Sequence, residues 1–151
     1  MKKMAAFGYA QVLVLLAIAC MVTVCQGQAE TIVVGGSENW RFGFNYTDWA
    51  LKRAPFYIND TLVFRYDPPS NTTPAAHSVY LLPNLWSYLT CDLRWAKLLA
   101  NSTQGSGDGF AFVLSQWRVY YFASGEGNKL NDCRVGGMKF FAIPLPRRRR
   151  A

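Results

Sequence analysis

The stretch FYINDTLVFRYDPPSN, residues 56–71, decides the fold class of this chain. Two runs of aromatic and β-branched residues flank a turn at Asn59-Asp60, which is typical of two short strands. In the second run, Leu62 and Phe64 point to one side and the residues between them to the other, with the period of two that a strand has. The Pro-Pro-Ser-Asn that closes the stretch ends the pattern and predicts a loop.

Further short β-rich runs lie on both sides of this stretch, separated by Gly, Pro, Asn and Ser turns. They are residues 31–34, 78–82, 110–114, 119–123 and 139–145. Leu93–Ala100 is the best helix candidate, with an irregular loop as the alternative, and one helical turn is expected over Tyr46–Leu51. Short strands at this spacing predict a sandwich or barrel and not an α/β enzyme. The five tryptophans and ten phenylalanines are expected mainly to fill the core.

The N-terminus has the features of a secretory signal peptide. Lys2 and Lys3 precede a nearly continuous apolar run over 12–24, which is too short to cross a bilayer comfortably. Small residues at Gly27 and Ala29 predict cleavage after Ala29. We therefore expect a signal peptide at 1–29, one domain at 30–145 and a basic tail at 146–151, with an uncleaved signal anchor as the alternative.

The charge of the chain is concentrated at its C-terminus. Without the signal, the chain keeps fourteen basic and nine acidic residues, a net charge of +5, of which four charges are Arg147–Arg150. The nearly neutral body does not favour nucleic-acid binding. We expect a flexible, solvated arginine run, with contact to an anionic lipid or an acidic glycan as the alternative. Because an anchor of this kind needs an apolar tail after a small-residue site, we expect no glycolipid anchor.

Two cysteines remain after the signal, Cys91 and Cys133. In an oxidising compartment they most simply form one disulfide, and two free thiols or a metal-binding pair are the alternatives. The same part of the chain holds four N-x-[ST] sequons, which predict N-glycosylation at some of them. The acceptor residues are Asn45, Asn59, Asn71 and Asn101.

The order and spacing of these elements resemble the plant phytocyanins. The residues that carry the resemblance are Gly35-Gly36-Ser37, Trp40, Tyr46, Trp49, Phe56, Asp60–Phe64, Tyr66, His77, Tyr88, Cys91, Tyr121-Phe122, Cys133 and Gly137-Met138-Lys139. The resemblance runs from about Thr31 to Ile143. It implies an all-β, cupredoxin-like Greek-key sandwich of seven to eight strands with one or two short helices, and a disulfide between the two matching cysteines.

The resemblance also implies a type 1 copper site, formed in working members by a His, a Cys thiolate, a second His and an axial Met or Gln. By position, His77 matches the first His and Met138 the axial ligand. Ser124 stands where the Cys belongs, and Asp132 stands where the second His belongs. A hydroxyl and a hard carboxylate suit copper(I) poorly. The chain is therefore similar to the early nodulin-like branch, whose members lack copper ligands, and we expect no copper cofactor.

The expected function is that of a secreted protein of the cell surface or apoplast, with the outer face of the plasma membrane as a place of association. It would bind a cell-wall glycan or a cell-surface protein, or have a structural role; blue-copper electron transfer is the alternative. An enzyme is not expected, because a single histidine gives little acid–base capacity. The first candidate for a ligand-binding face is the rim of His77, Trp86, Ser124 and Asp132. The simpler alternatives are a hydrogen-bonded His77, a core Met138 and a turn residue at Asp132.

Overall fold

The computed structural model describes residues 28–72, 74–127 and 130–147. Most of the predicted signal peptide, Thr73 of one sequon and Arg148–Arg150 therefore lie outside the described residues. Within the described part, no helix is both long enough and apolar enough to cross a membrane.

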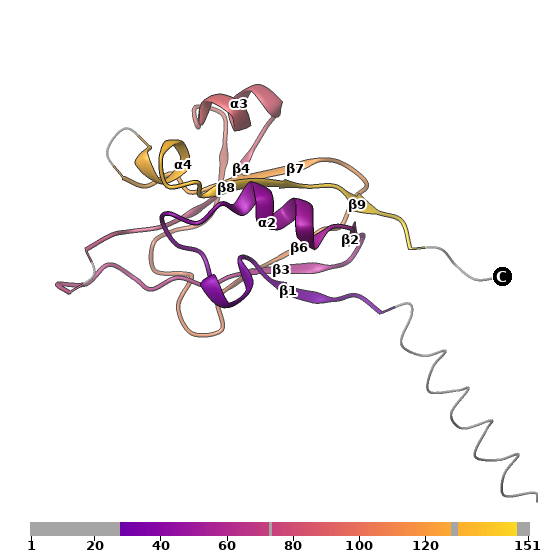
Figure 1. Ribbon diagram of the computed structural model, residues 1–151, viewed down its shortest axis with the longest axis horizontal. Coiled ribbons are helices and arrows are strands. Elements are labelled where there is room, and N and C mark those ends of the chain that lie inside the picture. Colours follow the sequence, from indigo (N-terminus) through magenta and orange to yellow (C-terminus); the bar gives the residue numbers. More distant parts are fainter. Residues whose placement is uncertain (1–27, 73, 128–129, 148–151) are drawn as a thin grey trace, which may run out of the picture. The chain divides into compact units, whose positions relative to one another are not determined.

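Two β-sheets lie one above the other in Figure 1. The first has the order β1-β3-β6, with strands Thr31–Val33, Thr61–Phe64 and Phe110–Val113; β1 runs parallel to β3, and β6 runs antiparallel to it. The second is antiparallel and has the order β5-β4-β7-β8, with strands Lys97–Ala100, Val79–Leu82, Tyr120–Ala123 and Lys139–Ala142. A short parallel pair joins β2, Phe56–Tyr57, to β9, Pro144–Leu145.

Aromatic side chains fill the space between the two sheets. The ring of Phe64 on β3 lies 5.4 Å from that of Phe122 on β7 and 6.1 Å from that of Phe140 on β8, between centroids. Trp40 contacts Phe64 edge-on at 5.2 Å. Leu62 joins Phe64 in this core, as the alternation within the strand predicts. The predicted all-β sandwich is confirmed. The described residues form nine strands, two of which have two residues, where seven to eight strands were expected.

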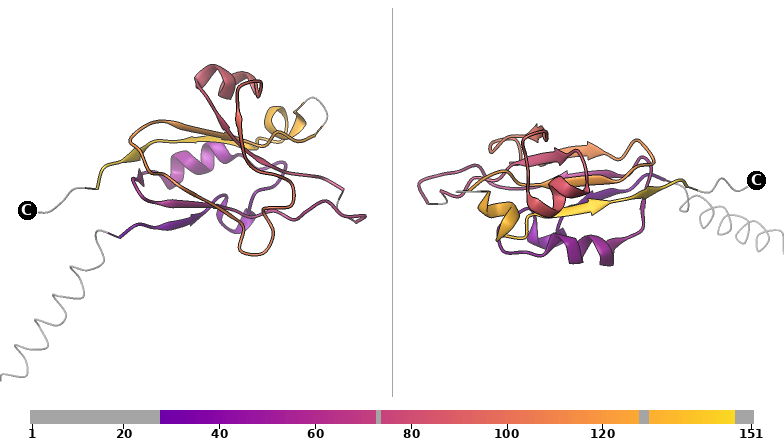
Figure 2. Two further views of the ribbon diagram at one scale, coloured as in Figure 1. Left: turned by 180° about the vertical axis from the view of Figure 1, so that it is seen from behind. Right: turned by 90° about the horizontal axis from the view of Figure 1, so that it is seen from above.

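Among the described residues, three short α-helices and one 3-10 turn connect the strands, where one or two short helices were expected. They are α2 over Tyr46–Arg53, α3 over Leu85–Thr90, α4 over Asn131–Arg134 and η1 over Gly36–Glu38. Helix α2 lies beside β8 in the views of Figures 1 and 2. The side chain of Asn45 accepts a hydrogen bond from the backbone of Asp48 at 3.0 Å and so caps α2. Helix α2 is longer than the single helical turn that was expected over Tyr46–Leu51.

The helix predicted over Leu93–Ala100 is wrong. The segment makes a turn in which the backbone of Ala96 donates to Leu93 at 3.0 Å, and it then forms β5, which pairs with the edge of β4. The free edge of β4 offers the backbone hydrogen bonds that helix propensity alone could not predict. The helix of this region is α3, which begins eight residues earlier. The Asn84 side chain caps it by accepting a hydrogen bond from the backbone N–H of Ser87 at 2.9 Å.

The predicted disulfide is confirmed, so the two alternatives for its cysteines are wrong. It joins Cys91, at the end of α3, to Cys133 on α4, with 6.0 Å between their Cα atoms. The expectation of a solvated basic end is wrong for Arg147. Its guanidinium pairs with the buried Asp60 carboxylate and lies over the Tyr57 ring at 4.7 Å.

Candidate functional site

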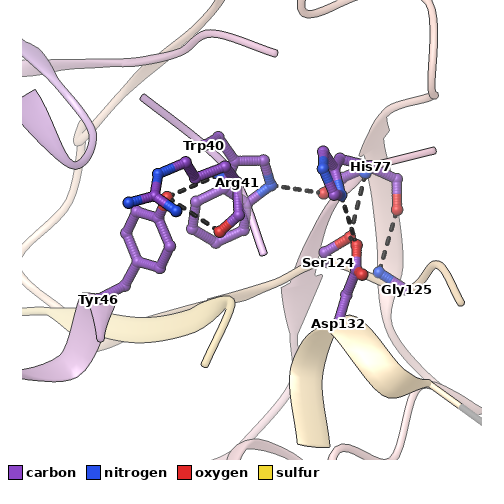
Figure 3. Close-up of polar contacts among 8 residues, drawn as sticks. Trp40, Arg41, Tyr46, His77, Ser124, Gly125 and Asp132 are labelled. Carbon is purple, nitrogen blue, oxygen red and sulfur yellow. Dashed lines mark hydrogen bonds and ion pairs between the residues drawn. The ribbon is translucent and has the colours of Figure 1, made fainter. Parts of the chain in front are cut away.

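Antiparallel pairing brings the predicted site residues to one end of the second sheet. Because β4 and β7 run in opposite directions, His77, just before β4, lies near Ser124, just after β7. Helix α4 then places Asp132 against both of them, as Figure 3 shows. The expected turn residue at 132 is thus corrected, since Asp132 belongs to a helical turn and its side chain points inward.

A buried carboxylate is the centre of this cluster. Asp132 Oδ2 lies 2.7 Å from His77 Nδ1 and accepts the Ser124 hydroxyl at 2.8 Å (Figure 3). The side chains of His77 and Asp132 are 12% and 7% exposed, and Ser124 is fully buried. We call these three residues the Asp132 cluster. They satisfy one another inside the protein, which is what burial of polar groups requires.

Residues that the sequence analysis did not identify hold the Asp132 cluster in place. The backbone N–H of Ser78 donates to Ser124 Oγ at 3.2 Å, and the Ser78 hydroxyl accepts from the backbone of Gly125 at 3.0 Å. The Trp40 indole donates to the carbonyl of Ser78 at 2.9 Å. The adjacency of Ser78 to His77 was the only signal for this role in the sequence.

The other two predicted residues are placed differently. Met138 is fully buried in the main core, and its backbone bridges the cluster, donating to Asp132 O and accepting from Ser124 N, each at 3.0 Å. Trp86 lies on α3, 68% exposed, and lines a separate hollow with Leu130 and Arg134. The residues of the predicted rim therefore lie in two places: Trp86 lines one surface hollow, and His77 connects the Asp132 cluster to another.

A second hollow, of about 430 Å³, lies beside His77, and its walls combine charged and aromatic side chains. Its walls include Trp40, Arg41, Arg65, Tyr66, Asp67 and His77. The Tyr66 hydroxyl donates to the carbonyl of Asn101 at 2.7 Å. Burial, with a smaller effect of the Glu126 charge, raises the pKa of Tyr66 to about 12, so the phenol is neutral. Glu38 also lines this hollow and pairs with Arg41, so Arg65 is the guanidinium of these walls that forms no ion pair with a described carboxylate. A guanidinium of this kind beside a neutral aromatic wall suits a ligand rich in hydroxyl or carboxylate groups.

The donor atoms of the Asp132 cluster do not fit type 1 copper. Such a centre needs a thiolate and two imidazoles, and the cysteines of the described part are both in the disulfide. His77 is the only imidazole of the chain, and its Nδ1 already contacts Asp132. The described residues also hold no group of three or more His, Cys, Asp or Glu side chains able to bind a metal.

The Asp132 cluster is also in the wrong order for nucleophilic catalysis. An activated serine hydroxyl donates its proton to a histidine, which a carboxylate then orients. Here the carboxylate lies between the two, so the Ser124 proton points to Asp132 and not to His77. The hydroxyl is fully buried as well. The arrangement stabilises three polar side chains and activates none of them.

Comparison with known proteins connects this fold to the blue copper proteins. No family model matches the chain. A protein named Blue copper protein 1a from Medicago truncatula is 33% identical over 70 residues, which are 46% of this chain and 39% of that relative. The chain thus matches about two fifths of the length of this curated relative.

Two solved structures resemble the whole domain. Cucumber basic protein, described as a blue copper protein, has a TM-score of 0.57 and 27% identity, covering 76% of this chain and 99% of its own. Cucumber stellacyanin has a TM-score of 0.59 and 20% identity, covering 79% and 98%. The second likeness shows the fold alone.

Proposed function

Because this chain has a phytocyanin-like cupredoxin domain, we propose that it is a secreted, cell-surface binding or structural module without a type 1 copper centre. We also propose that the chain is of the early nodulin-like type, whose members lack copper ligands. The observation that carries it is the Asp132 cluster, in which the atoms at the expected ligand positions are hydrogen-bonded to one another. The expected signal peptide and sequons support the secreted location.

Copper content and colour test this proposal. We expect protein from a plant secretory system to contain no stoichiometric copper by elemental analysis and to stay colourless with copper(II). Thiolate-to-copper charge transfer causes the intense colour of type 1 sites, and no free thiolate is present among the described residues. Intense blue absorption of the unmodified protein would contradict the proposal and favour the alternative function, blue-copper electron transfer.

Paired substitutions test the assignment of the ligand positions. Ser124→Cys alone should stay colourless, because it supplies a thiolate but leaves one imidazole. Ser124→Cys combined with Asp132→His should bind copper and become blue if these positions correspond to the missing ligands. A colourless double variant with a native-like circular dichroism spectrum would show that the assignment of Asp132 is wrong.

We further propose that the hollow beside His77 binds an acidic glycan. Arg65, which is exposed at its edge and forms no ion pair with a described carboxylate, supports this ligand class, whereas Arg41 is already paired with Glu38. Titration with oligogalacturonides should give saturable binding that Arg65→Ala weakens about tenfold. Arg94→Ala, which removes an exposed arginine at the other hollow, is the matched control and should have little effect. Equal effects of the two variants would contradict a specific site.

A further inference from the structure

A second buried carboxylate, far along the chain from the Asp132 cluster, has no role in the proposed function. Asp60, fully buried directly before β3, accepts the backbone N–H of Glu30 on Oδ1 at 2.9 Å and that of Tyr57 on Oδ2 at 2.8 Å. Arg147 also donates to Oδ1. A buried carboxylate needs such compensation, because an unpaired charge in the interior is strongly destabilising.

Arg147 alone is an incomplete partner for this carboxylate. One of its terminal nitrogens contacts Asp60, but its Nε is buried and has no hydrogen-bond acceptor among the described residues. The guanidinium plane is instead held over the Tyr57 ring. Oδ1 of Asp60 therefore has two partners: the Arg147 guanidinium, whose Nε lacks an acceptor in the described part of the chain, and the backbone nitrogen of Glu30.

Glu30 is the first residue whose groups are fixed by the sheet. Its carbonyl accepts from Thr61 N at 2.8 Å, directly before the first β1–β3 pair. Its side chain pairs with Arg53 at 2.6 Å. In Figure 1 this beginning of β1 and the end of β9 lie at the same end of the domain. The peptide bond before Glu30 is also the cleavage site that the sequence predicts.

We propose that cleavage between Ala29 and Glu30 creates an α-ammonium group that forms an ion pair with Asp60, so that this buried carboxylate is a receptor for the chain's own processed N-terminus. Hydrolysis adds water across the bond: Ala29 leaves as a carboxylate, and the nitrogen of Glu30 is protonated. The nitrogen is already within hydrogen-bond distance of Asp60 Oδ1, so no rearrangement is needed. The inference rests on the secreted location in the proposed function.

Cleavage converts a neutral hydrogen bond into a charge-assisted one. Hydrogen bonds between ionised groups are roughly twice as strong as neutral ones. The charged neighbours of the new ammonium are Asp60 and the Glu30 carboxylate, which attract it, and Arg147 and Arg53, which repel it. The buried and directly contacting Asp60 is the decisive partner, because the Glu30 side chain is 58% exposed and screened by water.

Mass spectrometry and amine labelling of the secreted protein test this inference. We expect the N-terminal peptide to begin at Glu30 with a free amine. A free α-amine has a pKa of about 7.7–8.0, and pairing with a carboxylate keeps it protonated and unreactive. At neutral pH it should therefore be acylated about tenfold more slowly in the folded protein than in urea, relative to the exposed Lys97 of the same molecule.

Two variants distinguish pairing from simple burial. Asp60→Asn keeps the shape of the side chain but should restore fast labelling, whereas Asp48→Asn, which removes an exposed carboxylate, should not. If Asp60→Asn does not fold, a Gly-Ser insertion before Glu30 serves instead, and it should label at the unfolded rate and lower the melting temperature. A mature terminus elsewhere, or equal labelling of the folded and unfolded protein, overturns the inference.

The outcomes also separate this inference from the proposed function. Failure to recover the protein from the medium would contradict the secreted location, and with it both proposals. A secreted protein that begins at Glu30 but has a freely reactive amine would contradict the ion pair alone. Copper content, measured on the same sample, decides the absence of a redox centre independently of either result.

Discussion

At position 132, one carboxylate determines what the neighbouring residues can do. Asp132 accepts the Ser124 proton and contacts His77 Nδ1 in a site that is almost closed to solvent. The Ser124 hydroxyl and the His77 imidazole are therefore both part of a buried hydrogen-bond network. Removing the central acceptor should therefore affect stability before it affects any surface property.

Asp132→Asn should lower the free energy of unfolding by about 1–3 kcal/mol, because a neutral amide oxygen binds the Ser124 hydroxyl and His77 Nδ1 more weakly than a carboxylate, and the amide NH2 adds a buried donor that needs its own acceptor. Urea unfolding measures this loss, and the single histidine gives one imidazole resonance that should shift with it. Asp48→Asn removes an exposed pair with Lys52 and should cost less than about 0.5 kcal/mol. Equal losses in the two variants would contradict the network.

Buried tyrosines predict a loss of stability in alkali. Burial raises the pKa of Tyr46 and of Tyr66 to about 12. Between about pH 10 and pH 12 the unfolded chain releases the phenolic protons and the folded protein keeps them. The stabilisation is therefore complete below pH 10 and is lost as the pH rises towards 12.

Tyr66→Phe should make the decline of unfolding free energy between pH 9 and pH 11 shallower, by up to about 1 kcal/mol over this interval. At neutral pH the variant should lose about 0.5–1.5 kcal/mol, because the hydrogen bond to Asn101 is removed. Urea unfolding at several pH values checks both effects. Parallel pH profiles for the variant and the wild type would contradict the assignment to Tyr66.

At the scale of elements, the region from Pro83 to Ala100 shows how caps and edges select structure. Asn84 begins α3, Cys91 ends it in a left-handed conformation, and the chain then returns along β4 as β5. A side-chain cap is a local feature, whereas the pairing of β5 depends on a strand more than ten residues earlier. The sequence can therefore predict the cap of α3 from neighbouring residues, but it cannot predict the pairing of β5 in the same way.

Asn84→Ala should lower the free energy of unfolding by about 1 kcal/mol, because the backbone N–H of Ser87 loses its acceptor. Asn84→Asp keeps an acceptor at the same place and should be close to neutral. Thermal or urea unfolding of the two variants checks the difference. Identical behaviour would show that α3 is held by its packing and not by its cap.

At the scale of the whole molecule, the disulfide fastens a second, smaller core to the sandwich. Cys91 and Cys133 pack with Leu82, Tyr88 and Ala123, apart from the main aromatic core. The bridge also holds α4, and with it Asp132, against the end of the second sheet. Stability and the geometry of the Asp132 cluster should thus be coupled through this bond.

Replacing both cysteines by alanine should lower the free energy of unfolding by roughly 3–4 kcal/mol, the loop-closure entropy of a separation of 42 residues in the chain-entropy model. Urea unfolding measures the loss. Alkylation of the unreduced wild type should detect no free thiol in the mature protein. Labelling of two cysteines before reduction would contradict the bridge.

The sequence by itself determined the sandwich and the pairing of its two downstream cysteines, and it shows Ser124 and Asp132 where the resemblance implies copper ligands. The alternation at Leu62 and Phe64 is a local consequence of strand geometry, and the residue types at two positions can be read without coordinates. Only the tertiary structure decided that Asp132 connects Ser124 with His77, that Leu93–Ala100 ends in a strand and that Arg147 is held by Asp60. These contacts join residues from 8 to 87 positions apart. Their partners are chosen by burial and by free sheet edges, which exist only once the chain has folded.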